Sequence, residues 1–357
     1  MMPAKPSPGS PAHGKNAMTE KRPFSPEVLE IDCARACDEI TVRIRTLMKD
    51  VLHKRGLVVG ISGGIDSSVT AALFIEAVGR ERTLGLQMPE RHSADETMGL
   101  STLIADHLQM PRIPIDITAV LEAVGYYEKY DQAVRSAIPA YGSGWKSKII
   151  ASDATLGRGF TFFSIVAASP EGETHIRRLQ LKAYLEVVAC TNFKQRIRKM
   201  FEYYHADRLN YAVAGTPNRL EYDQGFFVKL GDGAADLKPI AHLYKSQVYQ
   251  LARYLGLPEA IVQRRPTTDT YSLPQGQDEF FFSIPFESMD LCLYGKNHGY
   301  DTELVGRHTG LSADQVKAIY LDIDRKRAST RYLHLPPLLV SDVPEIALEV
   351  YKKGFTS

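Results

Sequence analysis

A short stretch of glycines and hydroxyl side chains carries the clearest chemical signal in this sequence. It reads Ser62-Gly63-Gly64-Ile65-Asp66-Ser67-Ser68 and lies between an apolar run and a helical pattern. Backbone N–H groups at the start of a helix bind anions, and glycines let the backbone approach phosphate oxygens closely. The hydroxyls of Ser62, Ser67 and Ser68 would add further donors. The stretch therefore predicts a phosphate-binding loop.

Asp66 is the unusual member of this loop, because a carboxylate repels phosphate unless a cation lies between them. Mg²⁺ is commonly held by one or two carboxylates together with phosphate oxygens, so Asp66 is predicted to be a magnesium ligand. The Gly-Lys-Ser/Thr ending of the common nucleotide P-loop is missing from the stretch. The structural alternative is a tight glycine turn in which Asp66 caps the helix that follows.

Alternating strand and helix patterns surround the loop and predict the elements that position it. Buried parallel strands are expected from apolar runs over residues 56–61, 83–88, 112–116 and 209–214. Helices are expected from Pro26 with Ser25 as its cap, from Val69 up to Gly79, over 94–107, and from about His175 to Tyr204. Strands that alternate with helices predict an α/β fold. Its doubly wound, mostly parallel, Rossmann-like sheet would carry helices on both faces.

Composition and charge exclude several classes of function. The chain has 357 residues, of which 43 are Lys or Arg and 42 are Asp or Glu, so no overall field favours nucleic acid or an anionic membrane. No apolar run reaches the roughly 20 residues of a membrane span, and a cytoplasmic protein is expected. The four cysteines are too few for a disulfide scaffold and form no zinc motif, so no metal is expected on sulfur.

The chain divides into one large domain with flanking segments. Residues 1–24 are rich in proline, serine and glycine and are expected to be a disordered tail. Residues 25–330 would form the domain, and residues 331–357 a C-terminal extension.

Several motifs resemble one family of enzymes. The segment from Ser62 to Ser67 matches the pyrophosphate loop of the N-type ATP pyrophosphatases, which cleave ATP between its α and β phosphates. The run from Thr216 to Lys245 closely resembles the ammonia-dependent NAD synthetases of that superfamily. The segment from Asn192 to Arg198 is similar to their Asn-x-Lys-x-Arg-x-Arg motif.

The resemblance implies a role for individual residues. Thr216 and Thr267 would contact ATP, and Glu221 would join Asp66 on Mg²⁺. Lys245 would bind the ATP phosphates and stabilise the charge of the departing pyrophosphate. The second substrate, deamido-NAD in the true synthetases, would be held by Arg196, Lys229, Asp236, Arg325 and Lys326. Without the resemblance, Arg196 and Arg198 would be interpreted as a solvated helix face and Lys245 as a surface charge.

The implied reaction has two steps and needs no covalent nucleophile. The acceptor carboxylate attacks the α-phosphate of ATP, and ammonia then displaces AMP from the acyl-adenylate to form an amide. No glutaminase-like segment is found before residue 30, so the ammonia would be free or come from a separate glutaminase subunit.

The resemblance also implies a homodimer. Two alternatives stay open, namely a relative that amidates another carboxylic acid and a catalytically inactive nucleotide-binding regulator; tRNA thiolation is disfavoured by the neutral charge.

Departures from the family pattern lie where the acceptor should bind. The stretch from about residue 122 to 181 is longer than the corresponding connection in NAD synthetases, and either a surface insertion or a lid that shapes the acceptor site is consistent with it. Arg325 replaces a histidine of the family's His-Lys-Arg element, and residues 271–297 match only loosely. The sequence therefore supports the ATP chemistry better than the identity of the acceptor.

Overall fold

A four-stranded parallel sheet forms the centre of the molecule. The computed structural model describes residues 23–93, 95–151, 162–267, 270–341 and 343–345. The strands are β1 (Leu57–Gly60), β2 (Thr83–Gln87), β3 (Arg112–Pro114) and β7 (Ala212–Val213), and their order is β3-β2-β1-β7 with every neighbouring pair parallel. Each strand occurs in one of the four predicted apolar runs. The predicted α/β fold is confirmed.

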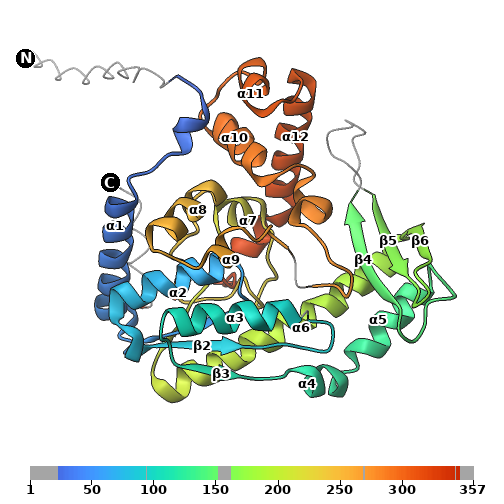
Figure 1. Ribbon diagram of the computed structural model, residues 1–357, viewed down its shortest axis with the longest axis horizontal. Coiled ribbons are helices and arrows are strands. Elements are labelled where there is room, and N and C mark those ends of the chain that lie inside the picture. The colour runs from blue at the N-terminus through green and yellow to red at the C-terminus, as the bar shows by residue number, and fades with distance from the viewer. Residues whose placement is uncertain (1–22, 94, 152–161, 268–269, 342, 346–357) are drawn as a thin grey trace, which may run out of the picture.

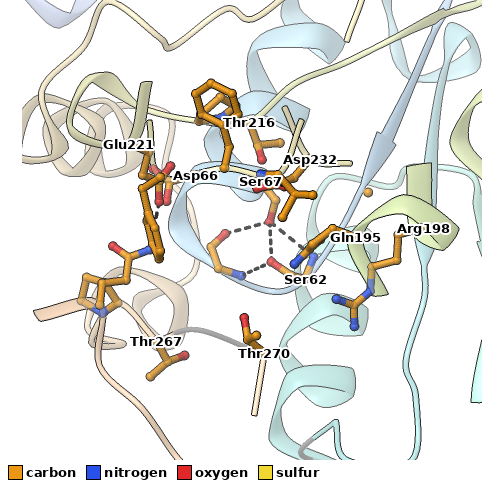
Figure 2. A pocket seen from close by; sticks show the side chains of 18 of the residues that line it. Ser62, Asp66, Ser67, Gln195, Arg198, Thr216, Glu221, Asp232, Thr267 and Thr270 are labelled. Atoms are coloured by element: carbon orange, nitrogen blue, oxygen red, sulfur yellow. Dashed lines mark hydrogen bonds between the residues drawn. The ribbon is translucent and has the colours of Figure 1, made fainter. Parts of the chain in front are cut away.

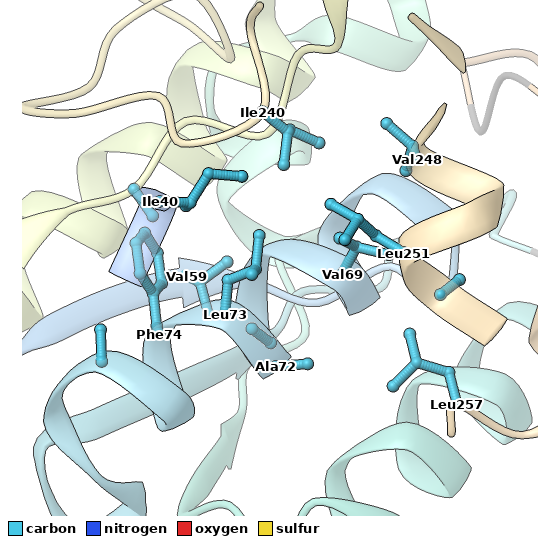
Figure 3. Packing of buried hydrophobic residues seen from close by; sticks show 14 of the residues in the cluster. Ile40, Val59, Val69, Ala72, Leu73, Phe74, Ile240, Val248, Leu251 and Leu257 are labelled. Carbon is cyan, nitrogen blue, oxygen red and sulfur yellow. The ribbon is translucent and has the colours of Figure 1, made fainter. Parts of the chain in front are cut away.

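Side chains alternate along β1 and so reach two separate cores. Leu57 and Val59 pack into one cluster with α1 (Cys33–Thr46), α2 (Ile65–Val78) and α8 (Lys245–Tyr254). Figure 3 shows this cluster, in which Val59 lies among Leu73 and Phe74 of α2 and Val248 and Leu251 of α8 are nearby. Because successive strand residues point to opposite faces, Val58 packs into the second core.

The second core lies on the other face of the sheet. Val58 meets Val213 and residues of α4 (Thr118–Ala123), α5 (Tyr126–Arg135) and α6 (Leu181–Leu209) there. Helices therefore cover both faces, as the doubly wound pattern predicts, and α3 (Asp95–His107) follows β2 (Figure 1).

Two predicted helix starts are wrong. The long helix begins at Leu181 instead of about His175, because residues 174–178 pair with a neighbouring strand. Ser25 precedes only a short 3₁₀ helix, Pro26–Leu29, and α1 begins after Asp32, whose carboxylate accepts a hydrogen bond from the Arg35 N–H at 3.1 Å. A proline and a serine favour a helix start without fixing its length.

A separate antiparallel sheet lies within the stretch between residues 122 and 181. It consists of β4 (Lys146–Ala151), β5 (Phe163–Ala168) and β6 (Thr174–Arg178) in that order, and Figure 1 shows it at one side of the molecule. Its edge strand β4 is tied to the distant loop 271–277. The Ser147 N–H donates to Ser272 Oγ at 2.8 Å, and the Leu273 N–H donates to the Ser147 carbonyl at 3.2 Å.

A helical unit at the C-terminal end has its own apolar core. It contains α10 (Phe286–Asn297), α11 (Thr302–Thr309) and α12 (Ala313–Thr330), and Phe24 packs into it with 5% of its surface exposed.

Residues 1–22 of the predicted tail lie outside the described residues, as do residues 342 and 346–357 of the predicted extension. The remaining short helices are Leu47–Leu52, Arg80–Arg82, α7 (Arg219–Gln224), α9 (Glu259–Val262), Asp278–Phe282 and Arg331–His334. No helix within the described part of the chain is long and apolar enough to cross a membrane.

Candidate functional site

The predicted phosphate loop joins β1 to the N-terminus of α2. Gly63 has a φ of +70°, and a Cβ there would lie 2.6 Å from the Leu100 side chain, so only glycine fits both the conformation and the space. The Ser67 hydroxyl donates to the Gly64 carbonyl at 3.0 Å and lies 3.2 Å from Ser62 Oγ. Figure 2 shows how these hydroxyls close the loop on itself. The loop therefore presents the first N–H groups of a 14-residue helix, which favour an anion.

A cavity of about 490 Å³ opens over this loop. Ser62, Gly64, Asp66 and Ser67 line it. Gly63 and Ser68 do not: Gly63 shapes the backbone, and Ser68 is fully buried with its hydroxyl donating to the Gly64 carbonyl at 2.8 Å. The sequence alone did not separate the residues that face a ligand from those that hold the loop.

Three charged side chains meet at one end of the cavity. Lys245, at the first position of α8, forms an ion pair with Asp66 of α2, and Glu221 of α7 lines the cavity beside them. Figure 2 shows Asp66 and Glu221 pointing toward the same space. Segments 179 residues apart in the chain thus supply the pair, and the sequence prediction that Asp66, Glu221 and Lys245 share a site agrees with this geometry.

Neighbouring amides hold the two carboxylates in place. The Asn218 side chain donates to Asp66 Oδ1 at 3.1 Å and also caps α7, where its oxygen accepts from the Glu221 N–H. Glu221 Oε2 accepts from the Asn218 N–H at 3.1 Å, and Glu221 Oε1 accepts from the Gln277 amide at 2.9 Å. A capping box, whose usual role is to begin a helix, therefore also orients a site carboxylate.

The electrostatics of this cluster follow from burial and from its uneven charge. Burial together with the charge of Asp66 raises the pKa of Glu221 to about 8. Burial alone would lower the pKa of Lys245, but the charges of Asp66 and Glu221 outweigh it and the pKa is raised. An additional cation would favour the ionised form of Glu221, because one ammonium balances only one of the two carboxylates.

A buried carboxylate on α10 fixes the start of the lysine-bearing helix. Asp290 Oδ1 accepts from the Lys245 N–H at 3.2 Å, and Oδ2 accepts from the Ser246 N–H at 2.7 Å and from the Ser246 hydroxyl at 2.6 Å. Asp290 thus satisfies N–H groups of α8 that have no partner within the helix. Burial raises its pKa to about 7. The sequence analysis did not single out Asp290, because a cap from a distant helix leaves no local pattern.

The remaining predicted ATP ligands also line the cavity. Thr216 follows β7 at the edge where the parallel strands end, and Thr267 lies on a loop after α9. Figure 2 places both around the phosphate loop. In open α/β sheets, ligands bind outside this edge of the strands, which explains why motifs distant in sequence converge here.

The residues predicted to hold the second substrate do not line the cavity in this chain. Arg196 is exposed, Lys229 Nζ donates to the Tyr332 carbonyl at 2.8 Å, and Asp236 Oδ2 accepts from the Val213 N–H at 2.7 Å. Arg325 is exposed on α12, and Lys326 pairs with Asp322 at 2.6 Å while donating to the Phe281 carbonyl at 2.5 Å. Their assignment to the substrate stays a prediction that these contacts do not support.

One face of α6 supplies cavity residues that the sequence analysis did not assign. It carries Tyr184, Val188, Thr191, Asn192, Gln195, Arg198, Lys199 and Glu202. These positions recur every three or four residues, so they form one stripe of about 27 Å at 1.5 Å per residue. Arg196 lies off this stripe. The sequence shows the three- and four-residue spacing of these side chains, but it does not show which side of the helix faces the sheet.

Comparisons with known proteins show which family this chain is similar to. The family model described as NAD synthase matches residues 37–139 and 164–331. The chain belongs to the NAD synthase family. It is 53% identical over 323 residues to the NH(3)-dependent NAD(+) synthetase of Rhizobium meliloti strain 1021, covering 90% of this chain and 96% of that relative. The family resemblance seen in the sequence is thus confirmed.

Two solved structures are similar in fold. A structure of NMN synthetase from Francisella tularensis has a TM-score of 0.58 and 22% identity, with 87% of this chain and all of that chain covered. An NH3-dependent NAD synthetase from Campylobacter jejuni has a TM-score of 0.57 and 20% identity, with the same coverage of both chains. At these identities the similarity establishes the fold alone.

Proposed function

We propose that this NAD synthase family member makes NAD from deamido-NAD, ammonia and ATP, and releases AMP and pyrophosphate. The observation that carries the proposal is the convergence of the Ser62–Ser67 loop, Asp66, Glu221 and Lys245 in one cavity. The same cavity continues along α6, and we assign that part to the second substrate. The enzyme is a carbon–nitrogen ligase, because the product amide joins the acceptor carbonyl to the nitrogen of ammonia.

The residues of the loop and of α8 perform the adenylation by position and charge. The N–H groups at the start of α2 and the hydroxyls of Ser62 and Ser67 bind phosphate oxygens of ATP. Lys245, held at the start of α8 by Asp290, offsets the negative charge that develops on the departing pyrophosphate. The acceptor carboxylate then needs only to be aligned with the α-phosphate, because binding both substrates in one cavity makes the attack intramolecular.

The cysteines are unsuited to a glutaminase reaction. Burial raises the pKa of Cys190 to about 11 and of Cys292 to about 12, and it also raises the pKa of Cys33 and Cys37. A thiol with a raised pKa is a poor nucleophile at neutral pH. We therefore infer that ammonia arrives free or from a separate glutaminase subunit.

Asp66 and Glu221 fit a magnesium ion that would accompany ATP. Both are carboxylates, both line the cavity, and a single ammonium balances only part of their charge. When bound, Mg²⁺ supplies Lewis-acid charge neutralisation at the phosphates. The raised pKa of Glu221 is consistent with a carboxylate that is stabilised in its ionised form only when a cation is added.

We also infer a homodimer, in line with the sequence-based expectation. Met200 and Tyr204 lie one turn apart on α6 and are 54% and 61% exposed, and Leu230 is 70% exposed. Large apolar side chains at this exposure favour burial against a second copy of the chain. A cytoplasmic location stays the prediction made from the sequence.

The function is tested by one assay with three readouts. The purified chain is incubated with Mg-ATP, ammonium and deamido-NAD, and NAD, AMP and pyrophosphate are quantified together. We expect the three products in equal amounts. AMP and pyrophosphate that form only with another carboxylic acid would refute the acceptor while keeping the chemistry. ATP binding without pyrophosphate release for any acid would favour the regulatory alternative. Sedimentation of the same protein tests the dimer.

A further inference from the structure

The antiparallel sheet β4–β6 brings an aromatic side chain into the substrate cavity. Phe163, the first residue of β5, stacks on Tyr184 of α6 with ring centroids 4.2 Å apart and planes inclined by 15°, and both rings line the cavity. The Phe163 backbone is anchored on two sides, since it pairs with Ala151 of β4 and its carbonyl accepts from the Leu179 N–H at 2.9 Å. The family match leaves out residues 140–163, so Phe163 belongs to a stretch outside it.

This sheet is built into the cavity wall instead of lying free on the surface. Besides the Ser147 contacts with residues 272 and 273, Lys148 Nζ donates to the Pro274 carbonyl at 3.0 Å, and the Gln275 amide donates to the Ile149 carbonyl. The loop fixed in this way carries Thr270, Tyr271 and Gln277, which line the cavity. A displaced β4 would therefore displace part of the site.

The aromatic pair lies at the opposite end of the α6 stripe from Glu202, whose Oε1 lies 3.0 Å from the position of a Cβ at Gly60, directly before the phosphate loop. Arg198 and Lys199 occur about 14 residues after Tyr184, which corresponds to about 21 Å along the helix. Under the proposed function the reacting carboxylate would lie near the phosphate loop, Asp66 and Lys245, because it must meet the α-phosphate of ATP there. The part of the acceptor that reaches the aromatic pair is thus the part most distant from its carboxylate.

We propose that Phe163 and Tyr184 form an aromatic subsite that stacks on the base of the acceptor's AMP half and selects a dinucleotide over a mononucleotide. The inference rests on the proposed function. A flat purine ring matches a stacked aromatic surface, and such stacking tolerates small changes in ring position. The stretch that carries β4 and β5 then acts as a determinant of acceptor choice.

The test compares variants of Phe163 with a neighbouring control. Phe163→Leu and Tyr184→Leu remove one ring each, and Phe162→Leu changes the adjacent residue, which lies outside the cavity against Arg178. We expect the first two to raise the KM for deamido-NAD about tenfold and leave the KM for ATP unchanged. Phe162→Leu should match the unchanged chain, and Phe163→Tyr should restore most of the affinity.

A truncated acceptor separates this role from a general loss of structure. Nicotinic acid mononucleotide lacks the AMP half, so its turnover should respond to Phe163→Leu by less than twofold. Calorimetric titration with deamido-NAD in the absence of ATP should show the same loss of affinity as the kinetics. An equal loss with both acceptors, a change confined to the KM for ATP, or an unchanged KM for deamido-NAD would each overturn the proposal. If the unchanged chain makes no NAD, the proposed function fails instead.

Discussion

The two ends of the cavity, which we assign to ATP and to the acceptor, are built in different ways. At the ATP end, Ser62, Asp66, Thr216 and Lys245 all lie directly after parallel strands or at helix starts near the same sheet edge. At the other end, side chains come from one face of α6, from a loop and from an added antiparallel sheet. The first end is determined by topology, because parallel strands bring their carboxyl ends together. The second depends on the rotation of a helix and on long-range contacts.

The largest effect is expected at the ATP end. Asp66→Asn removes a charge that pairs with Lys245 and that would bind Mg²⁺, so turnover should fall by about a thousandfold. Steady-state assays of pyrophosphate release measure it. Glu76→Gln on the exposed face of the same helix is the matched control and should change little. Near-normal activity of Asp66→Asn would show that the cluster is structural.

A smaller but more selective effect is expected from two arginines on α6. Arg198 lines the cavity and its Nε donates to the Met88 carbonyl at 3.2 Å, whereas Arg196 is exposed. Arg198→Met should therefore raise the KM for deamido-NAD about tenfold or more, and Arg196→Met by less than twofold. Kinetics of both variants at saturating ATP measure the difference. The reverse order would place Arg196 at the substrate, as the family resemblance implies.

The same contrast explains how far the sequence could predict the site. Asp66, Glu221 and Lys245 were identified together because each belongs to a motif with fixed positions, and the structure brings them into one cavity. Arg196 was chosen from a segment that also contains Arg198, and no sequence pattern states which of the two faces the sheet. Only the packing of α6 against β1 and α5 settles that phase.

The fold was predicted to a similar extent. The apolar runs located all four parallel strands, because burial on both faces leaves a continuous signal. The antiparallel sheet was missed, since β6 reads Thr-His-Ile-Arg-Arg and is mostly exposed. Its pairing with β5 creates the strand, and the residues before α6 were interpreted as helix in its absence.

A third prediction tests how α8 is held at the ATP end. Asp290 is buried and its pKa is raised to about 7, so the folded protein keeps a proton that the unfolded chain releases near pH 4. The free energy of unfolding should then fall as pH rises from about 4 to 7, by on the order of 1–4 kcal/mol. Urea unfolding across this range measures it. Glu221, whose pKa is also raised, adds a slope of the same sign, so Asp290→Asn should make the slope shallower without abolishing it. Asp324→Asn, at an exposed position of α12, should keep the full slope, and equal slopes in all three proteins would contradict the assignment.

The smallest effect concerns Asp236, which the family resemblance assigns to the acceptor. Its carboxylate accepts from the Val213 N–H at 2.7 Å and so supports the edge of β7. Asp236→Ala should lower the free energy of unfolding by about 1 kcal/mol, since one hydrogen bond of an exposed side chain is lost, and should leave the KM for deamido-NAD within twofold. Asp236→Asn keeps an acceptor oxygen and should be milder. A tenfold higher KM at unchanged stability would instead assign Asp236 to the substrate, and would mean that the acceptor reaches beyond the α6 stripe toward the edge of the parallel sheet.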